Sequence, residues 1–356
     1  MPSFPSSSEA TTARAVVIHA AHDLRVEEVA VAPPGPGEVA VRIERGGICG
    51  SDLHYFNHGG FGTVRLREPM ILGHEIAGRV AAIGPGVTRV RPGETVAVNP
   101  SRPCGSCRLC AAGLHNHCLD MRFYGSAMRM PHVQGGFRDV LVCSEVQAVP
   151  VPPHVSVAVA AFAEPFAVCL HAVRRAGPVT GRRVLVTGCG PIGALAIVAA
   201  RHAGAGEIVA TDVTPGALEM ARQVGADRAF DTAADPDALR PYEADKGWFD
   251  VVFECSGNAR ALAGAIAVAA PRARIVQLGL GGDMTLPINA IVAKEIELVG
   301  TFRFDDEFEW AVALLASGRV DVSPLLTATL PMADAAEAFR LASDRSRAMK
   351  VQLAFA

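Results

Sequence analysis

The feature that most limits how this chain can fold is a glycine-rich turn, Gly188-Cys189-Gly190-Pro191-Ile192-Gly193, set between two apolar runs. The run before it, 184–187, is short enough for a buried strand, and the run after it, 192–202, is compatible with a helix. Further strand-like runs, with helical patterns between them, follow at 208–211, 251–254 and 275–278. Strands that alternate with helices predict a doubly wound parallel sheet, and we expect this α/β domain to span residues 158–301.

The turn has the spacing G-x-G-x-x-G, which suits a dinucleotide. The glycines permit a tight turn and a close approach of the backbone to a pyrophosphate, whose charge meets the N-terminus of the following helix. Asp212 ends the next strand, roughly 20 residues further on, where a carboxylate can accept the ribose 2′-hydroxyl. Its alternative role is to cap the next helix. The following residues, Val213-Thr214-Pro215, offer no basic group for a 2′-phosphate, so we expect NAD rather than NADP.

The first half of the chain differs in pattern. Short strand-like runs at 15–19, 39–43, 78–83 and 94–98 are separated by turns rich in proline and glycine. We expect a β-rich domain over residues 14–157, completed by the C-terminal segment 302–356. Residues 1–13 are rich in Ser, Thr and Pro but lack a basic and an apolar region, so they predict a disordered tail rather than a signal peptide.

Four cysteines at C-x2-C-x2-C-x7-C can surround one tetrahedral metal: Cys104, Cys107, Cys110 and Cys118. A closed all-thiolate set is typical of structural zinc. An iron–sulfur cluster is the rival, but the ferredoxin pattern continues with three residues, a cysteine and a proline. Here seven residues precede the fourth cysteine and Leu119 follows it. We therefore expect structural zinc.

A second, more scattered set of possible ligands comprises Cys49, His74, Glu75 and Glu164. A single cysteine is more often a small core residue, and a single histidine is more often a hydrogen-bonded polar residue. Glu164, however, lies in an apolar run, where an unpaired carboxylate is costly to bury. One open metal site would account for all of these residues.

Composition excludes several other classes of protein. Half of the 356 residues are apolar, 19% are charged and the net charge is −3, which gives no basic surface for nucleic acid or membrane lipid. Apolar stretches such as 261–270 are shorter than the ~20 residues of a membrane span. Clustered cysteines without a secretory signal favour a reducing compartment, so we expect a cytoplasmic protein.

Together these motifs resemble the zinc-dependent medium-chain dehydrogenases of the sorbitol dehydrogenase branch. The resemblance is carried by the segments 49–54, Gly73-His74-Glu75, the four-cysteine lobe, Glu164-Pro165 and the glycine turn. Within that branch, residues 120–128, 131–137 and 301–304 are similar to the L-idonate 5-dehydrogenases. The resemblance implies a GroES-like β domain joined to a Rossmann domain, with the substrate between them. It also implies a homo-oligomer, either dimer or tetramer.

For the site, the resemblance implies a catalytic zinc held by Cys49, His74 and a glutamate, either Glu75 or Glu164. Such a zinc lowers the pKa of the substrate hydroxyl, and the nicotinamide accepts the hydride. Ser51 and His54 match the family's proton relay from the substrate to solvent.

The substrate contacts are expected from four residues: Tyr55, Arg122, Phe123 and Arg303. An aldonate needs a cation for its carboxylate, and arginine binds a carboxylate through two hydrogen bonds. We nominate Arg122 for that contact, against the alternative of a surface salt bridge, and expect Arg303 to contact hydroxyls. Tyr55 and Phe123 are equally well explained as packing.

The leading interpretation is NAD-dependent oxidation of L-idonate at C5 to 5-keto-D-gluconate. The alternative is a polyol 2-dehydrogenase acting on sorbitol or xylitol. A non-enzymatic zinc-binding or nucleic-acid-binding module would leave the glycine turn and Asp212 unexplained, and a zinc-free quinone reductase would lack the cysteine lobe.

Overall fold

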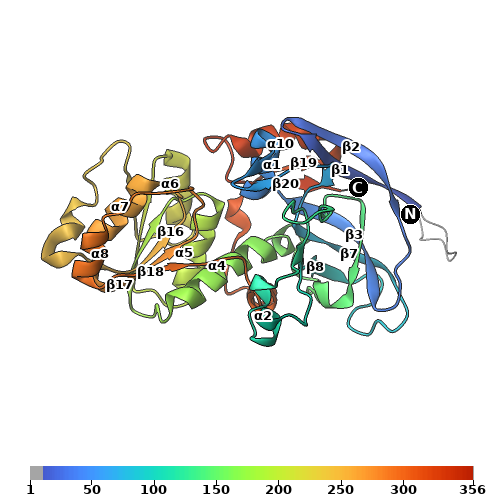
Figure 1. Cartoon of the computed structure of the whole chain (residues 1–356), viewed down its shortest axis with the longest axis horizontal. Coiled ribbons are helices and arrows are strands. Elements are labelled where there is room, and N and C mark those ends of the chain that lie inside the picture. The colour runs from blue at the N-terminus through green and yellow to red at the C-terminus, as the bar shows by residue number, and fades with distance from the viewer. Residues whose placement is uncertain (1–10, 356) are drawn as a thin grey trace.

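The computed structural model of the protein describes residues 11–355. Two parts lie side by side, a β-rich part and an α/β part (Figure 1). The main sheet of the β-rich part runs in the order β12-β8-β7-β3-β20-β19, with β11 also paired to β3. Its strands are β3 (Glu38–Gly47), β7 (Glu75–Ile83), β8 (Thr95–Val98), β11 (Val140–Ser144), β12 (Ala148–Pro150), β19 (Leu326–Pro331) and β20 (Lys350–Ala354). The last two strands bring the C-terminal segment back to the first half of the chain.

A smaller antiparallel sheet covers the β-rich core. It consists of β1 (Thr11–Ala20), β2 (Asp23–Val31) and β6 (Met70–Ile71). Residues 11–13 belong to β1 and pair with residues 29–31. This part of the expected disordered tail is therefore a strand instead. Residues 1–10 of that predicted tail lie outside the described residues. Helices α1 (Gly50–His58) and α10 (Ala335–Ser343) close the core, where Phe56 packs on Phe339.

The α/β part is a parallel sheet in the order β15-β14-β13-β16-β17-β18. Its strands are β13 (Arg183–Thr187), β14 (Glu207–Asp212), β15 (Arg228–Asp231), β16 (Phe249–Glu254), β17 (Ala269–Gln277) and β18 (Glu297–Gly300). The order reverses at β13, so the glycine turn after β13 lies at the switch point where doubly wound sheets bind ligands. This confirms the expected Rossmann-type sheet beside a GroES-like domain.

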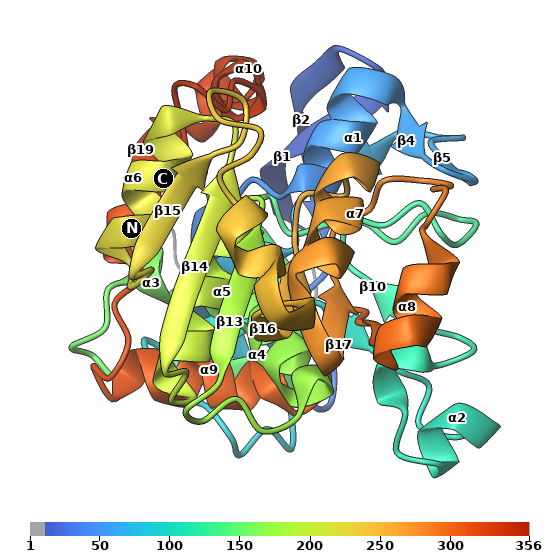
Figure 2. The same cartoon turned by 90° about the vertical axis from the view of Figure 1, so that its left-hand side faces the viewer.

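Alternation along β13 shows how the two faces are covered. Val184 and Val186 belong to one core, with residues of α4 (Ala163–Ala176), α5 (Pro191–His202), α6 (Pro215–Gln223) and α9 (Glu307–Ala316). Leu185 points the other way, into a core closed by α7 (Ala259–Val268) and α8 (Ile288–Lys294). Both faces are therefore buried, as a parallel sheet requires (Figure 2).

The expected domain limits at 157/158 and 301/302 stay predictions. The structure adds that α9, which follows the expected limit at 301, packs against α4 on the α/β side. Within residues 11–355, no helix is long and apolar enough to cross a membrane.

Candidate catalytic and cofactor sites

Three possible metal ligands converge where α1 meets β7. Cys49 is the N-cap residue of α1, His74 immediately precedes β7, and Glu75 is its first residue. Their ligand atoms all lie within 4.8 Å of one another. The register of β3 against β7, which places Gly47 opposite Glu75, brings the chain before α1 to the start of β7. Glu164, in the first turn of α4, is buried nearby but is not part of this trio.

Two charged residues that the sequence did not indicate complete the site. Lys350 of β20 is buried, and its Nζ donates to Glu75 Oε1 at 2.6 Å and to the Ile48 carbonyl at 3.1 Å. Asp52 is fully buried and accepts hydrogen bonds from the backbone N–H groups of Cys49 and Gly73. These contacts fix the backbone on either side of the trio.

The trio fits a divalent metal. His74 is buried, and its Nδ1, 3.7 Å from Asp52 Oδ1, has no hydrogen-bond partner among the described residues. Burial raises the pKa of the Cys49 thiol to about 12, and the charge of Glu75 adds to this effect. Burial also raises the pKa of Glu164 to about 8. A cation would compensate for this desolvated set, and thiolate, imidazole and carboxylate are the ligands of zinc.

Ser51 and His54 lie three residues apart on α1, one turn from Cys49, and both are half-buried. Residues at this spacing share a helix face. The ring of His54 contacts those of His58 and Phe61. Burial lowers the pKa of His54, which favours the neutral imidazole that can accept a proton.

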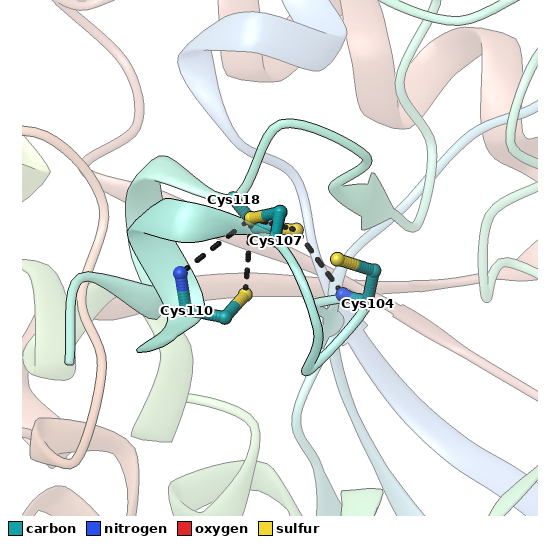
Figure 3. Close-up of side chains that lie close together, drawn as sticks. All are labelled: Cys104, Cys107, Cys110 and Cys118. Atoms are coloured by element: carbon teal, nitrogen blue, oxygen red, sulfur yellow. Dashed lines mark hydrogen bonds between the residues drawn. The ribbon is translucent and has the colours of Figure 1, made fainter. Parts of the chain in front are cut away.

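The four cysteines form a separate lobe around α2 (Arg108–Ala111), and their sulfur atoms lie within 4.8 Å of one another (Figure 3). Backbone N–H groups point at the sulfurs: Cys104 N is 3.1 Å from Cys118 Sγ and Asp120 N is 3.3 Å from it. The N–H of Cys110, followed by that of Leu119, lowers the pKa of Cys107 to about 6. Burial raises the pKa of Cys110 to about 12, so a bound cation would be needed to hold all four as thiolates, as in a closed zinc site.

At the cofactor turn, each glycine has a different reason to lack a side chain. Gly188 has φ +82°, and a Cβ there would lie 2.7 Å from the Ser256 backbone. A Cβ on Gly193 would lie 1.8 Å from the Gly188 carbonyl oxygen, so this glycine allows α5 to pack on β13. Nothing lies within 4 Å of a Cβ on Gly190, so the space beside this turn is open for a pyrophosphate. Pro191 and Ile192 begin α5.

Asp212 ends β14 beside this turn. Its carboxylate accepts hydrogen bonds from the N–H groups of Cys189, Val213 and Thr214 at 2.6, 2.7 and 2.8 Å. It is therefore fixed at the carboxyl edge of the sheet. Glu254, which the sequence did not single out, is fully buried at the same edge and accepts from Ser256 N and Gly257 N.

The expected substrate residues divide into two groups. Phe123 is buried, with its ring 5.4 Å from that of His74 and 4.0 Å from the Arg303 guanidinium. Arg122 precedes Phe123 on β10 (Arg122–Phe123) and is exposed. Successive side chains of a strand point to opposite faces, so Arg122 points away from the metal trio. Tyr55 is buried and its hydroxyl accepts from Ala127 N. It therefore supports the 126–128 loop.

Fold and site together define a metal-assisted dehydrogenase with a nicotinamide cofactor. The sequence matches the family "Alcohol dehydrogenase GroES-like domain" over residues 35–153 and the family "Zinc-binding dehydrogenase" over residues 191–317. The chain belongs to the zinc-binding, GroES-like alcohol dehydrogenases.

Among its relatives is the L-idonate 5-dehydrogenase (NAD(P)(+)) of Escherichia coli (strain K12), 45% identical over 88% of this chain and 91% of that protein. The sorbitol dehydrogenase of Gallus gallus is 34% identical over 95% of each chain. The crystal structure of L-idonate 5-dehydrogenase from Escherichia coli superimposes with a TM-score of 0.94 at 42% identity, covering 98% of this chain and 99% of that one.

Proposed function

We propose that this enzyme oxidises the C5 hydroxyl of L-idonate to 5-keto-D-gluconate and transfers the hydride to NAD. The observation that carries the proposal is Arg303. Its guanidinium lies over Phe123, makes no ion pair with an acidic residue among residues 11–355, and donates only to Met128 Sδ, at 3.3 Å. Burial lowers its pKa to about 10. The charge of Glu164 opposes this shift, but no carboxylate of residues 11–355 forms a hydrogen bond with the guanidinium. Such a desolvated cation favours a substrate that brings a carboxylate.

The similarity to an L-idonate 5-dehydrogenase over most of the chain also supports this substrate. The alternative is oxidation of a polyol such as sorbitol or xylitol at C2, favoured by the sorbitol dehydrogenases among the relatives. The two proposals differ in what Arg303 contacts, a carboxylate or a hydroxyl.

In the proposed reaction Cys49 and His74 hold the catalytic zinc, with Glu75 as the nearest carboxylate. Bound there, zinc supplies Lewis acidity that lowers the pKa of the substrate hydroxyl. Ser51 passes the hydroxyl proton along α1 and His54 exchanges it with solvent. We assign Glu164 the role of the second carboxylate, which would either replace Glu75 at the metal or hold a water.

Around this centre, Arg303 orients the remote end of the sugar acid, and the 188–193 turn fixes the cofactor so that its nicotinamide can accept the hydride. A second zinc, held by the four cysteines, completes the proposed metal content of two per subunit.

The proposed preference for NAD rests on charge at the sheet edge. Asp212 is paired in register with Asp231, which ends β15, so two acidic residues end neighbouring strands at this edge of the sheet. A 2′-phosphate near this edge would meet charge of the same sign, which disfavours NADP. The relative from Escherichia coli is named for both cofactors, so the strength of the preference requires measurement.

We also propose a homo-oligomer, dimer or tetramer, in the cytoplasm. Among residues 11–355, β18 is an edge strand of the parallel sheet, and its Leu298 is 40% exposed. Ile288 and Val292, one turn apart on α8, are 57% and 69% exposed. An open strand edge beside apolar side chains is suited to a second copy of the chain. None of the nine cysteines, all of which lie within residues 11–355, forms a disulfide, which is compatible with a reducing compartment.

The test is NAD reduction by zinc-loaded protein with L-idonate, D-gluconate, sorbitol and xylitol. We expect preference for L-idonate and, in Arg303→Ala, a rise in its KM on the order of 100-fold, since a charge-assisted pair contributes about 1.5–3 kcal/mol. Arg122→Ala is the matched control and should leave KM unchanged. Faster turnover of sorbitol or xylitol by the unmodified enzyme would assign it to the polyol dehydrogenases instead.

A further inference from the structure

The four-cysteine lobe makes side-chain contacts with the segment that carries Arg303. Asn116 Nδ2 donates to the Phe302 carbonyl at 2.9 Å, and His115 Nδ1 is 2.9 Å from Asp305 Oδ2. The ring of His117 stacks on that of Phe302, with centroids 5.8 Å apart and planes 29° apart. These contacts flank Arg303 on both sides, and they join positions nearly 190 residues apart in the chain.

Arg303 has a backbone conformation that needs such support. Its φ is +55°, in the left-handed region that few residues other than glycine adopt. A conformation of this kind persists only when its surroundings hold it in place. The next residue, Phe304, is buried against Phe308, which anchors the segment from the α9 side.

A second anchor lies beyond Asp305. Glu307 accepts a hydrogen bond from Asp305 N at 2.8 Å and is itself held by His171 and Arg174 of α4, each at 3.0 Å. The α/β part therefore fixes the segment from 304 onward. At its other end, Thr301 N donates to the Gln277 carbonyl of β17, and the lobe holds residue 302 by both its carbonyl and its ring. The lobe therefore contributes the contacts next to Arg303 on this side.

The contacting residues lie between two of the cysteines. His115, Asn116 and His117 form a short 3-10 helix (His115–His117) between Cys110 and Cys118. The cysteines lie together at the centre of the lobe, and the segment between two of them faces residues 302–305. Figure 1 places the lobe, marked by α2, where the two parts of the molecule meet.

We propose that the four-cysteine lobe is a positioning element for the substrate site: through Asn116 and His117 it holds Phe302, and thereby sets the direction of the Arg303 side chain. The lobe thus contributes to substrate recognition rather than only to folding. The identity of the group that Arg303 contacts rests on the proposed function; the role of the lobe does not.

The test compares zinc-loaded Asn116→Ala, His117→Ala and His117→Phe with Arg108→Ala, a control at an exposed residue of the same lobe. His117 is exposed, so its replacement should leave folding intact even where loss of the buried Asn116 does not. We expect a three- to tenfold higher KM for the preferred substrate in the two alanine variants, with KM for NAD and zinc content unchanged. His117→Phe keeps the ring stack and should restore the KM.

A readout independent of activity is hydrogen exchange of the backbone amides. In Asn116→Ala and His117→Ala, amides 301–306 should exchange faster while those of the 188–193 turn do not change. Unchanged KM and unchanged exchange at 301–306 in both alanine variants would overturn the proposal. An equal rise in KM and equally faster exchange at 301–306 in Arg108→Ala would also overturn it. A failure of the proposed function appears elsewhere, as a preference of the unmodified enzyme for a polyol, whose KM would then serve for the same comparison.

Discussion

Lys350 is a buried cation whose main partner, Glu75, lies 275 residues away in the sequence. Cys49, Glu75, Asp52 and Glu164 would bring up to four negative charges into one buried region. A dipositive metal neutralises part of this charge, and Lys350 neutralises a further unit. The lysine therefore matters most to the metal-free protein, where no other cation of residues 11–355 lies at hydrogen-bond distance from Glu75.

Lys350→Met should make the stability of the protein more dependent on zinc. Removing one partner of a buried ion pair costs about 3–5 kcal/mol because the other charge is left unpaired. We expect a loss of about 3 kcal/mol in the metal-free protein and a much smaller loss in the zinc-loaded protein. Urea unfolding with and without chelator measures both losses, with Lys246→Met as an exposed control. Equal losses in the two states would show that Lys350 only supports the fold.

Individual residues also show how much of the candidate site can be predicted from the sequence. The ligand candidates could be found because Cys49, His74 and Glu75 stand in a recognisable pattern, and the structure brings them together. Arg122 was preferred over Arg303 for the carboxylate because it lies in a segment typical of aldonate enzymes. Strand alternation favours Arg303 instead, because Phe123 faces the site and its exposed neighbour Arg122 therefore points away from it. Lys350 gave no local signal because its partner is distant in sequence.

At the scale of elements, β13, the glycine turn and α5 form one unit whose type could be predicted from the sequence. The short apolar run and the glycine spacing fix a strand, a turn and a helix in that order, and these elements were found. For the β-rich half, the sequence predicts only that it consists of strands and turns, not which strands pair. Its sheet joins β3 to β20 across the whole chain, and a pairing of that kind leaves no local pattern.

Two glycines of the turn should respond differently to the same substitution. Gly193→Ala places a methyl group against the Gly188 carbonyl, so α5 must move from β13, at a cost of about 1–3 kcal/mol. Gly190→Ala meets open space in the protein and should leave the melting temperature unchanged. Its methyl group would occupy the space for the pyrophosphate, so KM for NAD should rise on the order of tenfold. If Gly190→Ala bound NADH normally, the cofactor would lie elsewhere.

At the scale of the whole molecule, Glu307 holds α9 and the segment before it against α4 of the α/β part. It lies in the first turn of α9, accepts from Asp305 N in the segment that returns to the β-rich part, and is bound by His171 and Arg174 of α4. Burial alone would raise the pKa of Glu307, but the hydrogen bonds from His171, Asp305 N and Arg174 outweigh it and lower the pKa to about 2. Such a depressed value links the stability of these contacts to pH.

The direction of that dependence follows from the depressed pKa. Glu307 stabilises the folded state fully above its unfolded value of 4.5, and the contribution is lost as pH falls from there toward about 2. At neutral pH we expect Glu307→Gln to lower the free energy of unfolding by about 2 kcal/mol, discounted for partial solvent screening.

The difference in the free energy of unfolding between Glu307→Gln and the unmodified protein should shrink steadily as the pH falls below about 5. Urea midpoints of both proteins at pH 7, 5 and 4 measure it, and taking the difference removes the loss of metal at acid pH, which affects both. Glu309→Gln, whose exposed carboxylate pairs with Arg89, is the control and should change stability by less than about 1 kcal/mol. A constant difference in the free energy of unfolding across this range would mean that the charge of Glu307 does not stabilise its contacts with α4, and that only the packing of its side chain does.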